Sequence, residues 1–241
     1  MKYFAIEHSL DEKIMGNVEQ VKKVIHHCNV NYDKDFIDKF PFMKIETTPI
    51  LSNTVLHNNS KQTDLINSGG IGFTFGSLVI SNKFKEILDE FNCYGIQFFP
   101  TYIIQKDISN HNYWQTHIYE FSYEYIDFSK TKVVFKDRDE NRNVIKKNIE
   151  ISNLEEFLII AESLGYPKEI SLVDIHFKTD INLDFFRIKY SDDSYGIVSE
   201  RLKSELEKQQ CTGIEFRPIE LSYSEWSKSD GERQKVYGKS W

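Results

Sequence analysis

The chain has 241 residues, of which 40% are hydrophobic, so it is long enough to bury a substantial core and fold as a globule. Its 37 acidic residues exceed its 30 lysines and arginines, and the formal net charge of −7 disfavours binding to nucleic acid or to an anionic membrane. No stretch resembles a signal peptide or reaches the roughly 20 apolar residues of a membrane span, so we expect a cytoplasmic protein.

The first forty residues are predicted to be an appended N-terminal segment. Residues 2–7, "KYFAIE", read as an opening strand. Residues 17–30 are predicted to contain a helix, since Val21, Val24, Ile25 and Cys28 recur at helical spacing. Two prolines in residues 40–51 favour edge strands or loop entry over a central strand.

A sequence unit occurs twice, at "SNKFKEILDEFNCYGIQFFP" and at "SERLKSELEKQQCTGIEFRP", and Ser199 follows Ser81 by 118 residues. In each copy a serine can cap a helix, a glycine can end it, and an apolar strand follows. We therefore predict a duplicated strand, helix, strand unit at about 77–100 and 195–218. The residues that recur in register are Ser81/Ser199, Lys85/Lys203, Leu88/Leu206, Cys93/Cys211, Gly95/Gly213, Ile96/Ile214, Phe98/Phe216 and Pro100/Pro218.

The segment between the two copies mixes strands and helix. Residues 113–135 are rich in aromatic and β-branched side chains and predict antiparallel strands. Residues 153–165 predict a helix, with Asn153 as its N-cap and Glu156 three residues later. The mixture predicts an α+β fold with mixed or antiparallel sheets, in which residues 41–221 form a core domain of two related halves. Residues 222–241 are predicted to be a polar, only partly ordered tail.

We find no known motif for catalysis or cofactor binding in the sequence. The glycine-rich stretch 69–79 lacks the third glycine of a dinucleotide fingerprint and the Gly-Lys-Ser/Thr of a phosphate loop. The three cysteines lack zinc spacing, and the triplet His26 to Cys28 has no second ligand pair. We expect no catalytic residues, no metal site and no cofactor.

Three acidic surface loops, two of them with aromatic residues, are the candidates for binding a basic protein partner. Tyrosine and tryptophan beside carboxylates are typical of interface hot spots that meet a positive surface, although ordinary solvated turns have the same composition. The candidate partner-binding residues are Tyr190, Asp192, Asp193 and Tyr195 in the first loop, Asp137 and Asp139 in the second, and Glu225 and Trp226 in the third.

Two stretches resemble a family of bacterial immunity proteins from polymorphic toxin systems, formerly a domain of unknown function. They are "LDFFRIKYSDDSYGIVSERLKSELEKQQCTGIEFRPI" (183–219) and "YIDFSKTKVVF" (125–135), and the resemblance covers roughly residues 40–220. It implies a protein without catalysis that binds a cognate toxin and occludes its active site or substrate groove. The net charge suggests that the toxin surface is basic.

Two other functions stay open on the sequence alone. A small-molecule or glycan-binding module is favoured if an aromatic cleft opens near Trp114, Tyr119 and Tyr123. An enzyme is favoured if scattered carboxylates gather in a deep cleft. Neither reading has a sequence motif to support it.

Overall fold

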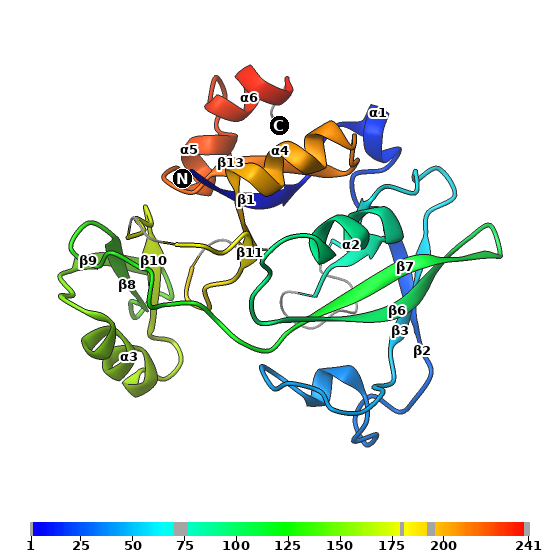
Figure 1. Ribbon diagram of the computed structural model, residues 1–241. Helices are drawn as coiled ribbons and strands as arrows, with labels where there is room; N and C mark the ends of the chain where they lie inside the picture. Colours follow the sequence, from blue (N-terminus) through cyan, green and yellow to red (C-terminus); the bar gives the residue numbers. More distant parts are fainter. Residues whose placement is uncertain (1, 70–76, 179–180, 192–195, 239–241) are drawn as a thin grey trace.

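The computed structural model describes residues 2–69, 77–178, 181–191 and 196–238, and it places them in three β-sheets connected by short helices (Figure 1). Most paired strands are antiparallel, and the six-stranded sheet also contains a parallel pair. The predicted α+β fold with mixed and antiparallel sheets is therefore confirmed.

The elements have the following bounds, with each sheet given in its strand order. The four-stranded sheet contains β11 (Phe185–Phe186), β12 (Ile197–Ser199), β1 (Tyr3–His8) and β13 (Ile214–Pro218). The six-stranded sheet contains β2 (Val21–His26), β3 (Ser52–Leu56), β6 (Ile96–Gln105), β7 (Ile108–Ile118), β5 (Val79–Ser81) and β4 (Leu65–Ile66). The three-stranded sheet contains β10 (Glu169–Val173), β8 (Lys132–Arg138) and β9 (Val144–Ile149). The helices are α1 (Glu12–Met15), α2 (Asn82–Asp89), α3 (Leu154–Ser163), α4 (Glu200–Lys208), α5 (Tyr223–Ser227) and α6 (Glu232–Tyr237), with a 3-10 turn at Ile37–Lys39.

Both copies of the repeated sequence form the predicted strand, helix and strand. They are β5, α2 and β6 in the first copy and β12, α4 and β13 in the second. The Ser81 hydroxyl accepts the Phe84 N–H, and the Ser199 hydroxyl accepts the Leu202 N–H, so each serine is the N-cap of its helix. Helices α2 and α4 lie side by side and share one buried apolar cluster with strands of both sheets (Figure 1).

The two copies also share the order of their strands. The first copy lies in the order β4-β5-β7-β6, and the second repeats it as β11-β12-β1-β13. Ser81 of β5 pairs with Tyr113 of β7, as Ser199 of β12 pairs with Tyr3 of β1. The N-terminal strand β1 therefore completes the second copy, in the place that β7 has in the first. Residues 1–40 thus contribute an inner strand to a core sheet, and the division of the chain into domains stays a prediction.

Two buried aspartates tie the copies to each other. The Asp64 carboxylate accepts the Ser81 hydroxyl (2.6 Å) of its own copy and the Thr212 N–H (2.7 Å) after the helix of the other copy. In the same way, Asp184 accepts the Ser199 hydroxyl (2.5 Å) of its own copy and the Asn92 N–H (3.0 Å) that follows α2. Each helix start is thereby linked to the opposite helix end.

A cation completes each of these two sites. Lys83 lies 3.0 Å from Asp64, and Arg201, which has the same place in the repeat, makes two hydrogen bonds to Asp184. Burial alone would raise the pKa of Asp184, but hydrogen bonds from Arg201, Ser199 and the Asn92 backbone outweigh it and lower that pKa. The pKa of Asp64 is lowered as well, so both carboxylates are held ionised.

The helix predicted within residues 17–30 is wrong, because Val21–His26 forms strand β2. This strand pairs antiparallel with β3, and a bulge between Val21 and Lys23 interrupts the alternation of its side chains. The bulge gives the apolar residues a spacing that imitates a helical face. The β-branched residues Val24 and Ile25 are consistent with a strand.

We expect replacement of Asp184 by alanine to lower the free energy of unfolding by about 3 kcal/mol, because it removes the buried acceptor for Ser199 and the Asn92 N–H. Chemical denaturation measures the change. Asp89→Ala is the control, because Asp89 is half exposed and pairs only at the surface with Lys85, so that its loss should cost less than about 0.5 kcal/mol. Equal losses in the two variants would contradict the prediction.

The stability of the fold should fall as the pH falls toward about 4. Burial lowers the pKa of His8 to about 4, and a backbone hydrogen bond with Ile66 offsets only part of that effect. The unfolded imidazole, with a pKa of about 6.5, takes up a proton first, so this contribution is complete above pH 6.5 and is lost between about 6.5 and 4. His8→Gln should reduce the change of the free energy of unfolding with pH by up to about 1.4 kcal/mol per pH unit. Urea denaturation of the wild type and the variant from about pH 7 to 5 gives the free energy of unfolding at each pH. The same pH dependence in both proteins would refute the prediction.

Candidate partner-binding surface

The Asp139 carboxylate stabilises the acidic turn between β8 and β9 through local hydrogen bonds. Asp139 accepts the N–H groups of Asn141 (2.9 Å) and Asn143 (2.8 Å) and the side-chain amide of Asn143 (2.9 Å). The hydrogen bonds from Asn143 and Asn141 hold the pKa of Asp139 below its usual value. Asp139 therefore shapes the turn, and Asp137 lies one residue before the end of β8.

The loop that starts at Tyr190 lies beside β10. The Leu172 N–H donates to the Tyr190 carbonyl (2.7 Å), and the Tyr190 ring packs edge-on against Phe157 with centroids 5.6 Å apart. Tyr190 is thus half-buried against the core of the small sheet. The other predicted contacts of this loop, Asp192, Asp193 and Tyr195, lie outside the described residues.

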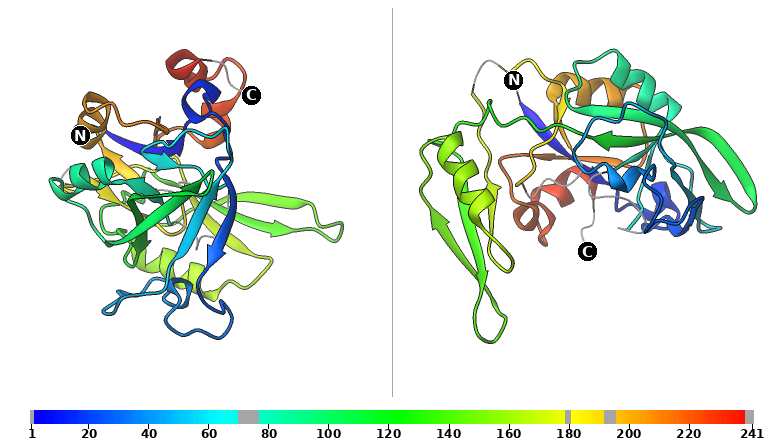
Figure 2. Two further views of the ribbon diagram at one scale, coloured as in Figure 1. Left: turned by 90° about the vertical axis from the view of Figure 1, so that its right-hand side faces the viewer. Right: turned by 90° about the horizontal axis from the view of Figure 1, so that it is seen from below.

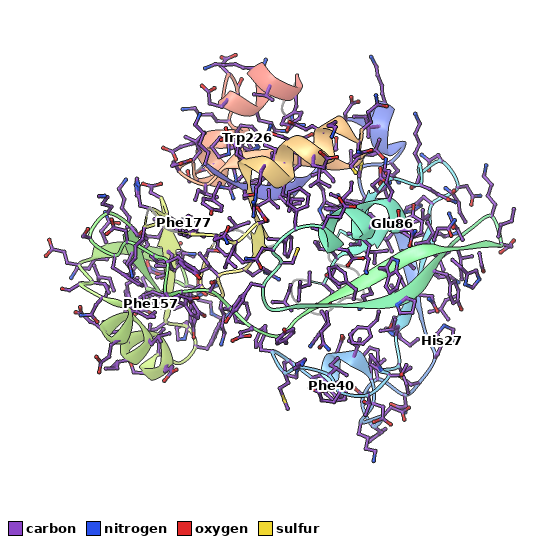
Figure 3. All side chains as sticks on the ribbon, in the orientation of Figure 1. His27, Phe40, Glu86, Phe157, Phe177 and Trp226 are labelled. Atoms are coloured by element: carbon purple, nitrogen blue, oxygen red, sulfur yellow. The ribbon has the colours of Figure 1, made fainter. Side chains whose placement is uncertain are left out.

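The third predicted loop folds into helix α5, and the structure corrects the role of its tryptophan. Trp226, labelled in Figure 3, is only 2% exposed and packs against Tyr237 with ring centroids 6.1 Å apart. A partner cannot reach this ring while the chain is folded. Glu225 forms a capping box with Ser222, which the Ser-x-x-Glu spacing could have indicated.

The expected partly ordered tail is also corrected, because α5 and α6 are fastened to the four-stranded sheet. Arg233 of α6 makes two hydrogen bonds (2.7 and 2.8 Å) to Glu215 of β13, and both side chains are at most 3% exposed. Glu215 also accepts the Leu10 N–H (2.9 Å), so the pair connects both ends of the chain. Sequence patterns gave no sign of this pair, since its partners are separated by a helix and a turn.

The predicted acidic residues do not form one patch in the described part of the chain. Glu225 does interact electrostatically with Lys132 at the start of β8, so α5 lies near the base of the β8–β9 hairpin. Tyr190 borders β10, an edge strand of the same small sheet. Of the three predicted loops, the described residues thus lie at different elements of the small sheet and at α5.

A surface that composition did not reveal lies on the β8–β9 hairpin, which projects from the rest of the chain (Figure 2). All residues from Glu140 to Asn148 are exposed, among them Val144 (55%) and Ile145 (49%). Tyr166, before β10, is 90% exposed. A hollow of about 290 Å³ runs between Tyr166 and Val144 and is bordered by Lys136, Arg138, Lys168 and Glu169. Exposed apolar groups beside charged ones are typical of a protein contact.

Two other hollows have different surroundings. One of about 260 Å³ lies between residues 48–51 and β6, next to His27 and Tyr102, and its exposed lining is mostly apolar. Another of about 210 Å³ lies beside Phe177 and Tyr3 (Phe177 and His27 are labelled in Figure 3). Both are smaller than the roughly 300 Å³ at which ligand pockets begin.

The aromatic residues considered for glycan binding line none of the three hollows described above. The Trp114 indole donates to Asn82 (3.0 Å) and its ring lies 5.0 Å from the Lys85 ammonium. Tyr123 packs against the core, and burial raises its pKa. Trp114 therefore packs against α2, and Tyr123 packs against the core of the small sheet, so neither side chain lines one of these hollows.

The histidines make local hydrogen bonds. His26 bonds to Ser52 (2.6 Å) and His27 to Asn53 (2.5 Å), which fastens the end of β2 to β3. Among the described residues, no three histidine, cysteine or carboxylate side chains are placed to hold a metal ion. Within the same residues, no helix has the length and apolarity needed to cross a membrane. Most of the glycine-rich stretch 69–79 lies outside the described residues.

Comparison with family models assigns the chain to the class of immunity proteins. The matching model is described as "Immunity protein family (Imm11)" and covers residues 38–221, so the chain belongs to this family. The resemblance inferred from residues 125–135 and 183–219 is confirmed. A search of curated proteins finds no match.

Replacing Arg233 by alanine should lower the free energy of unfolding by about 3–5 kcal/mol, because Glu215 would remain buried without its cation. Lys235→Ala on the same helix is the control, since the ion pair of Lys235 with Glu232 is exposed and its loss should cost less than about 1 kcal/mol. Thermal and urea denaturation provide the comparison. A loss for Arg233→Ala as small as that of the control would show that α6 is not fastened in this way.

Proposed function

We propose that this chain is an immunity protein that neutralises a cognate bacterial toxin by binding it and covering its active site or substrate groove. The observation that carries the proposal is the match of residues 38–221 to the immunity protein family. The chain would act by association alone, without catalysis or a cofactor. Its place would be the cytoplasm of the cell that makes the toxin, as protection in competition between bacteria.

A rigid scaffold supports inhibition by occlusion. The reciprocal Asp64 and Asp184 contacts and the Arg233–Glu215 pair fix the two halves and both chain ends before any partner arrives. A preformed surface loses little conformational entropy on binding, so more of the contact energy remains as affinity. An interface of ordinary size can therefore hold a toxin tightly if a few anchors are well packed.

The acidic loop after Tyr190 remains our proposal for a contact with a basic toxin surface. Its support is the sequence itself, with Asp192 and Asp193 between two tyrosines, and the net charge of −7. Opposite charges would speed the encounter with the toxin and make its rate depend on salt. Asp137 and Glu225 would add to the same field from neighbouring elements.

Co-expression with the product of the adjacent gene tests the proposed function. We expect rescue of growth, and co-purification of a stable complex with a catalytically inactive form of that product. A harmless neighbour, or one that kills regardless and never co-purifies, would remove the proposal.

Charge reversal at Asp192 and Asp193 should weaken the complex at least about tenfold, which corresponds to about 1.4 kcal/mol. The matched control is the same charge change at Glu155 and Glu162, both exposed on α3. The control should bind within about twofold of the wild type, because these two carboxylates are outside the loop proposed to contact the toxin. Calorimetric titration gives both affinities, and equal affinities would exclude the loop.

A further inference from the structure

The outer edge of β9 is an open strand edge. In the three-stranded sheet β9 is the last strand, and its six register pairs with β8 run from Val144 to Ile149 without a bulge. No described residue pairs with its other side. An edge of this kind presents unpaired backbone groups that can accept a further strand.

The hydrogen bonds around this sheet show which backbone groups point outward. In the turn, the Asp139 N–H donates to the Asn143 carbonyl (3.0 Å), which makes them a hydrogen-bonded pair. Because such pairs alternate along an antiparallel ladder, the N–H and C=O groups of Val144, Lys146 and Asn148 point away from β8. At the other edge the Leu172 N–H points outward to Tyr190, which fits the same alternation.

The other strands at the ends of the sheets have their edges occupied or distorted in the described part of the chain. The Phe216 N–H of β13 donates to the Tyr237 hydroxyl, and the Leu65 N–H of β4 donates to the Thr212 carbonyl. Tyr190 and Ser191 border β10, and Cys93 and Tyr94 border β11. Strand β2 carries a bulge, a common protection of edges, and it precedes the part matched by the family model. Strand β9 is regular and lies within that part.

The side chains of β9 specify the chemistry of a strand that could join it. Lys146 and Lys147 are adjacent and exposed, so one ammonium stands on each face of the sheet. Val144 and Ile145 precede them and expose about half of their surface. Lysines at an edge keep out apolar strands, but carboxylates directly opposite would pair with them.

From this geometry we propose that β9 is the docking edge for an extended, acidic strand of the toxin, which would extend the three-stranded sheet. The inference rests on the proposed function, since it takes the toxin as the partner. A second copy of this chain is a poor occupant, because antiparallel pairing of two β9 strands would set lysines against lysines.

The first test measures the affinity of the complex with the inactive toxin after charge reversal. Lys146→Glu with Lys147→Glu should weaken binding by about tenfold to a hundredfold, whereas Lys22→Glu with Lys23→Glu, on the bulged edge strand β2, should change it less than about twofold. All four side chains are exposed lysines on sheet-edge strands, so the two variants match in charge and in secondary structure. Equal affinities of the two variants would overturn the docking edge.

The second test uses the backbone and does not depend on charge. Lys146→Pro removes an N–H that the β8 ladder does not use, so it should keep the melting temperature and still weaken binding at least tenfold. In the wild-type chain, hydrogen exchange of the Lys146 and Asn148 amides should slow by at least tenfold when the toxin binds. If the wild-type chain binds and rescues but these amides exchange as before, the docking edge is wrong and the proposed function stands. If the wild-type chain forms no complex, both fall.

Discussion

The structure depends on a pair of buried carboxylates that each serve two halves of the chain. Asp64 and Asp184 accept the capping serine of their own half and a backbone N–H after the helix of the other half. A carboxylate removed from water is tolerated only when such donors and a cation surround it, so neither half can satisfy its aspartate alone. The two halves are therefore interdependent, and α2 and α4 meet over one core.

The repeat was predictable because its sequence signals are local. The addition of β1 to the second copy was not predictable. A capping serine, a helical stripe and a glycine lie within twenty residues, and Gly95 and Gly213 both adopt positive φ with a backbone carbonyl close to the missing side chain. The position of β1 depends on pairing with strands about two hundred residues away, which no local pattern encodes. Strand β2 was missed because its bulge imitated a helix. An origin of the halves by duplication stays a prediction.

The candidate surface could be predicted only in part, because composition does not show which side of an element faces water. The sequence of α5 places Trp226 among polar residues, yet the ring is buried, since α5 and α6 close over β13 through Arg233 and Glu215. Asp139 looked like a free surface charge but forms its own turn. The open edge of β9 is a property of strand order, and its residues look like an ordinary charged hairpin.

The small sheet is the part of the chain that has no counterpart in the other half. In sequence it lies between β7 and β11. Its strands and α3 pack around Phe157 in a cluster that also includes residues of the four-stranded sheet and that differs from the cluster under α2 and α4. Residues 140–148 are exposed, so changes there would cost the fold little, while changes to Asp64 or Asp184 would disturb both halves at once. Substitutions on this exposed hairpin can therefore change the surface of the protein with little loss of stability. That division gives a physical reason to look for specificity on the hairpin rather than on the repeated units.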